Sequence, residues 1–416
     1  MRIELLDEVR FDNFASTHKY ANYFQTSNYG KLMTKNGHNS YYLGLLDETN
    51  NIKAATLIIV KNDKNERKKT GYAPRGFLID WEDDSLVTTF TNLLIEFLSK
   101  RGFTSIKLDP KVIYKEHNTD GTDKEGTIPK DEFVKKLQTL GYIHMGYNNK
   151  MEASKPRWNA IMNLNPDITA LYNTLSKEAR QKIKTANQYG CKVYKGSKED
   201  INLFYDSLEK KDTPLDYYLD YYQFFNLNNK FEMYFSKLEP VTYVNTTKML
   251  FSKEEETNQS LNSAIQDINL KDKEQLINEK LKSDEDLARY KKNMIEAINL
   301  FQSYPSGIII AATAVIKHNN TITFLDTGVN DSFMDKYPDY ILKWHLMQEF
   351  AIQGYKVMEC NGIIGEFDDS YYNLSKRELS NLVVEYIGEF DLVINKKTYY
   401  SNSKLDPILN WLNTPI

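Results

Sequence analysis

Cysteine is scarce in this chain of 416 residues, which contains Cys191 and Cys360 alone. Two such distant cysteines provide neither a disulfide framework nor the spacing of a metal site, so no metal is expected and a reducing, cytoplasmic setting is favoured. No apolar run reaches the roughly 18 residues that a membrane span needs. The opening residues also lack the pattern of a signal peptide.

An excess of positive charge is missing as well. The sequence has 53 Lys and Arg against 57 Asp and Glu, which gives a net charge of −4. Any contact with nucleic acid must therefore come from a local basic patch. At about 150 residues per domain, the length predicts two or three domains.

Glycine and proline are absent from residues 245–304. Apolar residues recur there three and four positions apart, which is typical of helices. Asp272 followed by Gln275 is typical of a capping box that begins a second helix. We expect antiparallel helices at about 248–269 and 273–302, forming an inserted helical-hairpin arm. The pattern alone allows either a solvated hairpin packed on the body or an arm that reaches a partner.

Two distant stretches share one layout. Each has an Ala-Ala-Thr strand followed by a second segment, an amphipathic helix, a glycine and a final strand. The first ends with Gly102 and Asp109, and the second with Gly354 and Asn361. A glycine after a helix supplies a left-handed stop. In the second stretch we expect a hairpin that turns at Asn319–Asn320, so the layout indicates a duplicated module.

This order of elements is that of N-acetyltransferase-like folds. We therefore expect an α+β fold with two such modules, at about 1–150 and 151–391, the second carrying the arm. A C-terminal piece, about 392–416, is expected to pack on the first module. These folds usually hold the CoA pyrophosphate on a glycine-rich turn that opens a helix. No such turn is present, so no CoA cofactor is expected and the acyl donor must be another molecule.

A basic segment, SKEARQKIKTANQYGCKVYKGSK, precedes the predicted arm. Its cations include Arg180, Lys182 and Lys184, which are candidate tRNA or phosphate ligands. Lys182 and Lys184 cannot share one face of a helix. An ordinary solvated helix face is the alternative interpretation.

Six segments in order along the chain resemble the FemA/FemB/FemX/MurM family of peptidoglycan bridge-forming aminoacyltransferases. One of them, YAPRGFLID, has Phe77 where the family usually has Pro. The six segments are YFQTSNYGKLMTKNG, YAPRGFLID, IKLDPKV, RQKIKTANQYGCKV, YILKWHLMQEFAIQGY and EYIGEFDLVINKKTYY.

The resemblance implies transfer of an aminoacyl group from aminoacyl-tRNA to an amine of a peptidoglycan precursor, lipid II or a UDP-MurNAc-peptide. The tRNA is then a co-substrate, which accounts for the missing CoA turn. The arm corresponds to a hairpin like that of seryl-tRNA synthetase. A cytoplasmic enzyme would meet a lipid-linked precursor peripherally, at the inner face of the plasma membrane. Gly, Ala and Ser all remain open as the donated residue.

The resemblance also implies two catalytic candidates. Lys376 matches the lysine of the family's Phe-Lys-Lys motif, with Ser375 in place of Phe, and an ammonium suits a diphosphate or an oxyanion. Arg377 beside it is expected to be solvated. Asp109 matches an aspartate near the acceptor site, where it would orient the amine or accept its proton. A simple turn-starting Asp-Pro is the alternative for Asp109.

Four further residues are candidate substrate ligands by the same resemblance. Lys31 and Tyr221 match residues that contact the precursor, and Arg75 belongs to the YAPRGFLID segment. Lys211 stands where the family often has Arg, and it lacks the bidentate fork of a guanidinium. Asp326 stands where relatives have Tyr, and a carboxylate beside a phosphate site is unfavourable.

Two other functions stay open at this point. The chain would also fit an acetyltransferase-fold enzyme that conjugates an acyl or aminoacyl group to a different acceptor. It would equally fit a non-catalytic interaction module whose helical hairpin docks a partner. The departures at Ser375 and Asp326 are the features that favour this last interpretation.

Overall fold

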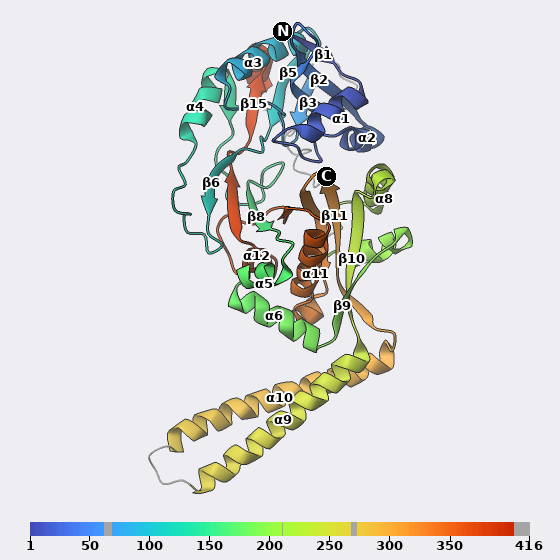
Figure 1. Cartoon of the computed structure of the whole chain (residues 1–416), viewed down its shortest axis with the longest axis vertical. Coiled ribbons are helices and arrows are strands. Elements are labelled where there is room, and N and C mark those ends of the chain that lie inside the picture. The colour runs from blue at the N-terminus through green and yellow to red at the C-terminus, as the bar shows by residue number, and fades with distance from the viewer. Residues whose placement is uncertain (62–68, 210, 268–272, 403–416) are drawn as a thin grey trace.

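The computed structural model describes residues 1–61, 69–209, 211–267 and 273–402. It contains two mixed β-sheets with helices packed around them, and two long helices extend from the second sheet (Figure 1). The α+β class that the sequence predicts is therefore confirmed.

The first sheet has the strand order β1-β2-β3-β4-β5-β15-β7. Its strands are β1 (Arg2–Leu5), β2 (His38–Leu46), β3 (Ile52–Lys61), β4 (Lys69–Ala73), β5 (Phe103–Leu108), β15 (Phe390–Val393) and β7 (Tyr142–His144). The helices of this part are α1 (Glu8–Thr17), α2 (Ser27–Lys35), α3 (Asp84–Ser99) and α4 (Asp131–Thr139).

The second sheet has the order β6-β14-β8-β13-β12-β11-β10-β9. Its strands are β6 (Ile113–His117), β14 (Leu382–Tyr386), β8 (Trp158–Asn163), β13 (Val357–Glu359), β12 (Thr321–Val329), β11 (Ile308–His318), β10 (Phe231–Leu238) and β9 (Cys191–Lys195). The shorter helices here are α5 (Ile168–Thr174), α6 (Lys177–Gln188), α7 (Ile201–Ser207), α8 (Leu215–Phe225), α11 (Pro338–Ile352) and α12 (Tyr371–Glu378). The C-terminal helix α13 (Lys396–Asn402) packs instead against β5 of the first sheet.

The repeated layout is confirmed by the pairing of the strands. In both sheets an antiparallel pair is followed by a helix and by a strand parallel to the second member of the pair: β3–β4–α3–β5 and β11–β12–α11–β13. Gly102 and Gly354 end the two helices with φ of 78° and 90°, which side chains rarely adopt. Asn319, with φ of 51°, forms the predicted turn between β11 and β12.

The two sheets exchange strands. β6 follows β5 directly but pairs in the second sheet, and β15 follows β14 directly but pairs in the first. β5 with β15 and β6 with β14 form antiparallel pairs, and the backbone N–H of Ile387 donates to Val112 O between them. A two-stranded ribbon thus runs through both sheets. The domain limits 1–150, 151–391 and 392–416 stay predictions, and residues 403–416 lie outside the described part.

One apolar cluster is shared by the two halves. Side chains of α1, α2 and β3 pack there with those of α8, β10 and β11. Phe11, Tyr29 and Leu57 contribute from the first half, and Phe225 and Phe235 from the second. Because burying such side chains is the main favourable term in folding, this cluster holds the halves together beside the ribbon.

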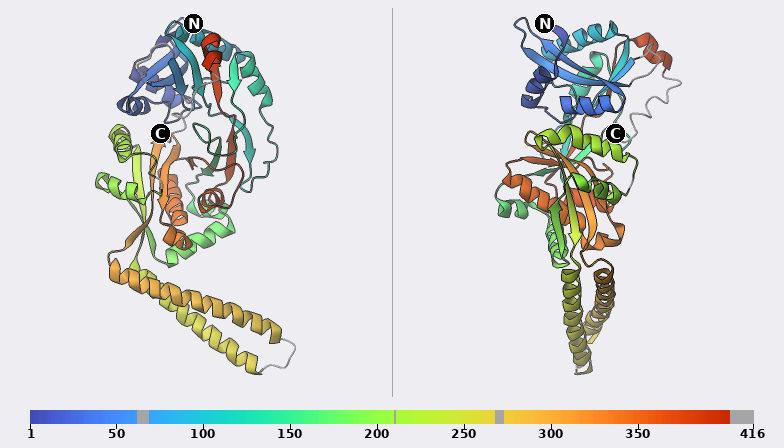
Figure 2. Two further views of the ribbon diagram at one scale, coloured as in Figure 1. Left: turned by 180° about the vertical axis from the view of Figure 1, so that it is seen from behind. Right: turned by 90° about the vertical axis from the view of Figure 1, so that its right-hand side faces the viewer.

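Two long helices, α9 (Pro240–Asp267) and α10 (Lys273–Ser303), pack side by side and extend away from the second sheet (Figure 2). α9 begins eight residues earlier than the sequence predicts, because Pro240 suits the first turn of a helix, where no N–H is needed. The predicted cap at Asp272 lies outside the described residues. No described helix is long and apolar enough to cross a membrane.

Candidate active site

A cavity of about 250 Å³ opens where β12 and β13 diverge. The two strands pair only from Thr321 to Thr323, and beyond this point Asn361 Nδ2 bridges them by donating to Leu325 O at 3.0 Å. The carboxyl ends of strands in open α/β sheets are where ligands bind. The lining comprises Met151, Phe324, Leu325, Asp326, Thr327, Lys343, Cys360, Asn361, Tyr372 and Lys376.

Lys376 lies on α12 and lines this cavity. Its Nζ donates to Gly362 O at 2.8 Å, which leaves the other two N–H groups of the ammonium for a ligand. Burial is the main cause that lowers the pKa of Lys376 below its ordinary value. The site thus holds a cation that is poorly compensated, and an anion in the cavity would stabilise it.

Ser375, where the resemblance predicts Phe, lies in a buried polar cluster. Its Oγ donates to Asp339 Oδ2 at 2.5 Å and accepts from Lys343 Nζ at 3.1 Å. Asp339 and Lys343 form an ion pair on α11, and all three side chains are buried. A buried ion pair needs further hydrogen bonds to offset its desolvation, and Ser375 supplies two where a phenyl ring would supply none.

Asp326 lies in the same cavity, and it does not face the site as a bare carboxylate. Its Oδ2 accepts from the hydroxyl of Tyr218 on α8 at 2.8 Å, and its Oδ1 accepts from the Thr327 N–H at 2.8 Å. Burial raises the pKa of Asp326, while Lys376 acts in the opposite direction. The hydroxyl of Tyr218, which the sequence did not indicate, therefore partly offsets the negative charge of Asp326.

A second polar cluster surrounds Asp109, directly after β5. Asp109 Oδ1 accepts from the Arg75 backbone N–H at 2.8 Å and from the Tyr72 hydroxyl at 3.1 Å. The Arg75 guanidinium lies 3.6 Å from Asp109 Oδ2, donates to Pro156 O at 2.7 Å and stacks over the ring of Tyr386. Burial raises the pKa of Asp109. Two residues predicted for different roles, Arg75 and Asp109, thus form one buried ion pair.

Two other predicted acceptor ligands, Lys31 and Tyr221, belong to neither cluster, although Tyr221 is close to the second one through Tyr23 and Tyr29. Lys31, on α2, pairs with Glu8 at 2.6 Å and lines a separate hollow with Tyr42 and Phe224. Tyr221 is only 1% exposed and packs against Tyr217 in the shared apolar cluster, where burial raises its pKa to about 12.

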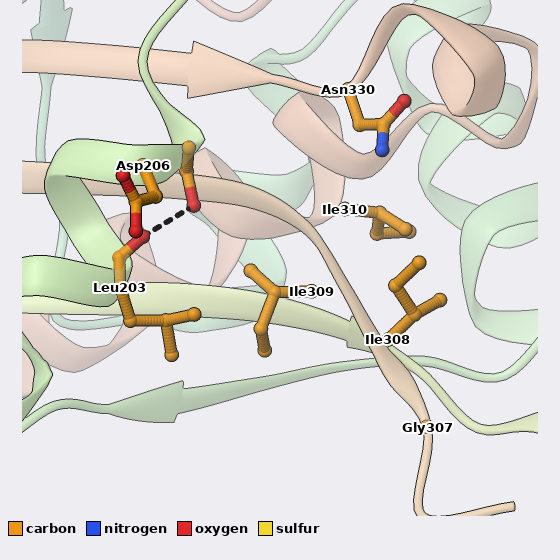
Figure 3. A pocket seen from close by; sticks show the side chains of 8 residues that line it. Leu203, Asp206, Gly307, Ile308, Ile309, Ile310 and Asn330 are labelled. Atoms are coloured by element: carbon orange, nitrogen blue, oxygen red, sulfur yellow. Dashed lines mark hydrogen bonds between the residues drawn. The ribbon is translucent and has the colours of Figure 1, made fainter. Parts of the chain in front are cut away.

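Lys211 lies beside a groove of about 460 Å³ between α7 and the start of β11 (Figure 3). Its Nζ pairs with Asp206 at 3.0 Å, and Asp206 lines the groove. Leu203, Ile308 and Ile309 make most of the wall apolar. The Lys211 ammonium is thus already paired in this structure.

The basic helix α6 presents its cations to different surroundings. Lys182 Nζ is 2.7 Å from Glu378 Oε2 and donates to the Tyr340 hydroxyl at 3.0 Å, so it joins α6 to α12 instead of facing solvent. Lys184 is exposed, and Arg180 lies over the ring of Tyr172. Of the three predicted ligands, Arg180 and Lys184 therefore remain those that a phosphate can reach, and Lys177 at the start of the helix is exposed as well.

The expectation that Arg377 is solvated is wrong. Arg377 is only 6% exposed, and its guanidinium donates to Asp368 O at 2.8 Å and to Asp369 Oδ1 at 3.0 Å. It also donates to Thr119 O, so it ties α12 to the segment after β6. The sequence does not reveal this role, because two of the partners are backbone carbonyls and one of them, that of Thr119, is far away in the chain.

Comparison with known proteins agrees with this architecture. The sequence matches the FemAB family over residues 6–406. Aminoacyltransferase FemA of Staphylococcus epidermidis is 23% identical over 410 residues, covering 96% of this chain and 97% of the relative. FemA of Staphylococcus aureus strain MRSA252 is 23% identical over 429 residues, covering 98% of this chain and 99% of that protein.

A solved structure of FemX has the same overall fold. It superposes with a TM-score of 0.71 at 16% identity, covering 96% of this chain and 99% of FemX. Together with the family match over nearly the whole length, this places the two sheets and their linking ribbon in a known architecture. The chain belongs to the FemAB family.

Proposed function

We propose that this protein transfers an amino acid from aminoacyl-tRNA to the stem-peptide amine of a peptidoglycan precursor, either lipid II or a form that already carries bridge residues. The names of the relatives support aminoacyl transfer. The observation that carries the proposal is the cationic cavity at the divergence of β12 and β13, with Lys376 in its wall. Gly, Ala or Ser is the donated residue.

The reaction is aminolysis of an activated ester, so the protein must position the amine, remove a proton from it and stabilise the oxyanion. In this proposal the two N–H groups of Lys376 that Gly362 does not use face the developing negative charge. Asp109 orients the acceptor amine. Its buried Oδ2 has no hydrogen-bond partner among the described residues, so an acceptor ammonium would share this oxygen with the Arg75 guanidinium 3.6 Å away.

The surface that holds the tRNA includes α6. Arg180 and Lys184 on α6 offer a small basic face near the base of the helix pair α9–α10. Acidic side chains outnumber basic ones over residues 240–303, which disfavours a polyphosphate contact along the whole length of that pair. We therefore assign the phosphate contact to α6 and a shape-dependent contact to the helix pair.

The decisive experiment offers the purified protein three acceptors: lipid II, lipid II with one bridge residue, and a UDP-MurNAc-peptide. Each is mixed with tRNA charged with Gly, Ala or Ser, and mass spectrometry identifies the product. We expect one amino acid to be added to a lipid-linked acceptor by an enzyme working peripherally at the membrane. Uncharged tRNA is the matched control. Turnover with none of these acceptors would contradict the proposal and would favour a different amine acceptor.

A further inference from the structure

The segment between β7 and β8 joins the two polar clusters. Met151 lines the Lys376 cavity, and the carbonyl of Pro156 accepts from Arg75 in the Asp109 cluster. Pro156 also packs against Gly362, where an added Cβ would come within 2.4 Å of the proline ring. Since Gly362 is the residue whose carbonyl binds Lys376, residues 151–156 form a wall between the two sites.

Lys155 lies in this wall and is half-buried. Its Nζ is 4.6 Å from the ring centroid of Phe24, and no salt bridge or hydrogen bond to it is found within the described ranges. By contrast, Lys107, Lys336 and Lys343 are buried and each has a carboxylate within 4.0 Å. A desolvated ammonium without a carboxylate is costly unless the group has a use or loses its proton.

The charged groups that act on Lys155 belong to the Asp109 cluster. Burial is the main cause that lowers the pKa of Lys155, to about 8, with Arg75 acting in the same direction and Asp109 opposing it. Glu389 fixes the backbone of the preceding residue, since its Oε1 accepts from the Ser154 N–H at 2.7 Å. Within this cluster the amine is partly neutral near physiological pH, whereas an ordinary lysine is not.

We propose that Lys155 is the group that removes the proton from the acceptor ammonium; this inference rests on the proposed aminoacyl transfer. The Lys155 Nζ lone pair takes one proton from R–NH₃⁺ and leaves R–NH₂. The amine nitrogen then forms a bond to the ester carbonyl carbon, and the bond from that carbon to the ribose oxygen breaks. A second proton passes from the nitrogen to the departing oxygen, and Lys155 releases its own proton to solvent.

The position of Lys155 explains why this residue suits the step. A carboxylate at Asp109 holds the amine on one side of the wall, and the cation at Lys376 faces the ester oxygen on the other. A base on the wall near Asp109 completes the arrangement, because general bases work best when their pKa is near the operating pH. Asp109 is thereby a positioning residue, and the proton acceptor is the neighbouring amine.

The test measures kcat/KM against pH for the wild-type protein, Lys155→Arg and Lys155→Met, with charged tRNA and the acceptor that the wild type uses. Arginine keeps the positive charge but cannot lose its proton. We expect wild-type kcat/KM to rise with pH and to level off above about 8. Both variants should lose on the order of 10²-fold or more, and the rising limb near that pH should disappear.

Lys150, exposed in the same segment and paired with Glu366, is the matched control. Lys150→Arg and Lys150→Met should leave rate and pH profile unchanged. Thermal unfolding of every variant separates loss of the base from loss of the fold. If Lys155→Arg restores wild-type rates and pH profile, the residue acts only as a fixed charge and the inference is overturned. If the wild-type protein itself adds no amino acid to any acceptor, the proposed function fails instead.

Discussion

Replacement of Lys376 by Met is the sharpest probe of the cavity between β12 and β13. Methionine keeps much of the length and apolar stem but removes the ammonium, and with it the 2.8 Å hydrogen bond to Gly362 O. If the ammonium faces the developing oxyanion, its loss should lower kcat on the order of 10²–10³-fold, as for the removal of one oxyanion-hole donor. KM for the precursor should change less.

The stability of Lys376→Met should stay close to that of the wild type because two terms oppose each other. The carbonyl of Gly362 loses its donor, which costs about 1–3 kcal/mol when such a group is buried. In return, the folded state no longer holds an ammonium that burial disfavours, as the lowered pKa of Lys376 indicates. We expect a net change within ~1 kcal/mol, or a few degrees in Tm.

The assay is steady-state turnover with charged tRNA and precursor, beside thermal unfolding. Arg377→Met cannot serve as a silent control, because the Arg377 side chain is buried and hydrogen-bonded. Lys397→Met is the better control, because Lys397 on α13 is exposed. A raised precursor KM with wild-type kcat would show that Lys376 only holds a phosphate group. Wild-type turnover of Lys376→Met would refute the assignment of this cavity to the chemistry.

Three further predictions concern other parts of the molecule. Ser375→Phe should destabilise the fold by about 3 kcal/mol or more, measured by urea unfolding, because it overpacks the core and strips two hydrogen bonds from a buried ion pair. Charge reversal at Arg180 and Lys184 should weaken tRNA binding and flatten its dependence on salt in a filter-binding titration, and an unchanged slope would remove α6 from the tRNA surface. Lys155→Met should unfold at a higher temperature than the wild type at pH 7, and at the same temperature above about pH 10. The folded pKa of Lys155, about 8, lies below the unfolded value of ~10.4, so the free-energy penalty for its charge disappears as the pH rises between these two values. Equal unfolding temperatures at pH 7 would show that the ammonium does not destabilise the fold.

The elements that depend on local rules could be predicted from the sequence. The duplicated order of strand, helix and strand follows from hydrophobic periodicity and from Gly102 and Gly354, whose positive φ ends each helix. The turn at Asn319 follows in the same way. The helices near 248–269 and 273–302 follow from the absence of residues that would break them. Each of these signals acts between neighbours in the chain, so one sequence is enough to detect it.

The environment of each candidate side chain was decided only by the tertiary structure. Lys376 and Arg377 are adjacent in sequence, yet their surroundings differ. Lys376 lines a cavity, whereas Arg377 donates to the backbone of Thr119, far away in the chain, and of Asp368, just before α12. Tyr221 matched a family residue but lies in the apolar cluster. Lys155 gave no signal in the sequence at all. Its lowered pKa comes mainly from burial, and this burial depends on residues that are distant in the chain, such as Phe24, Arg75 and Asp109, which no local pattern records.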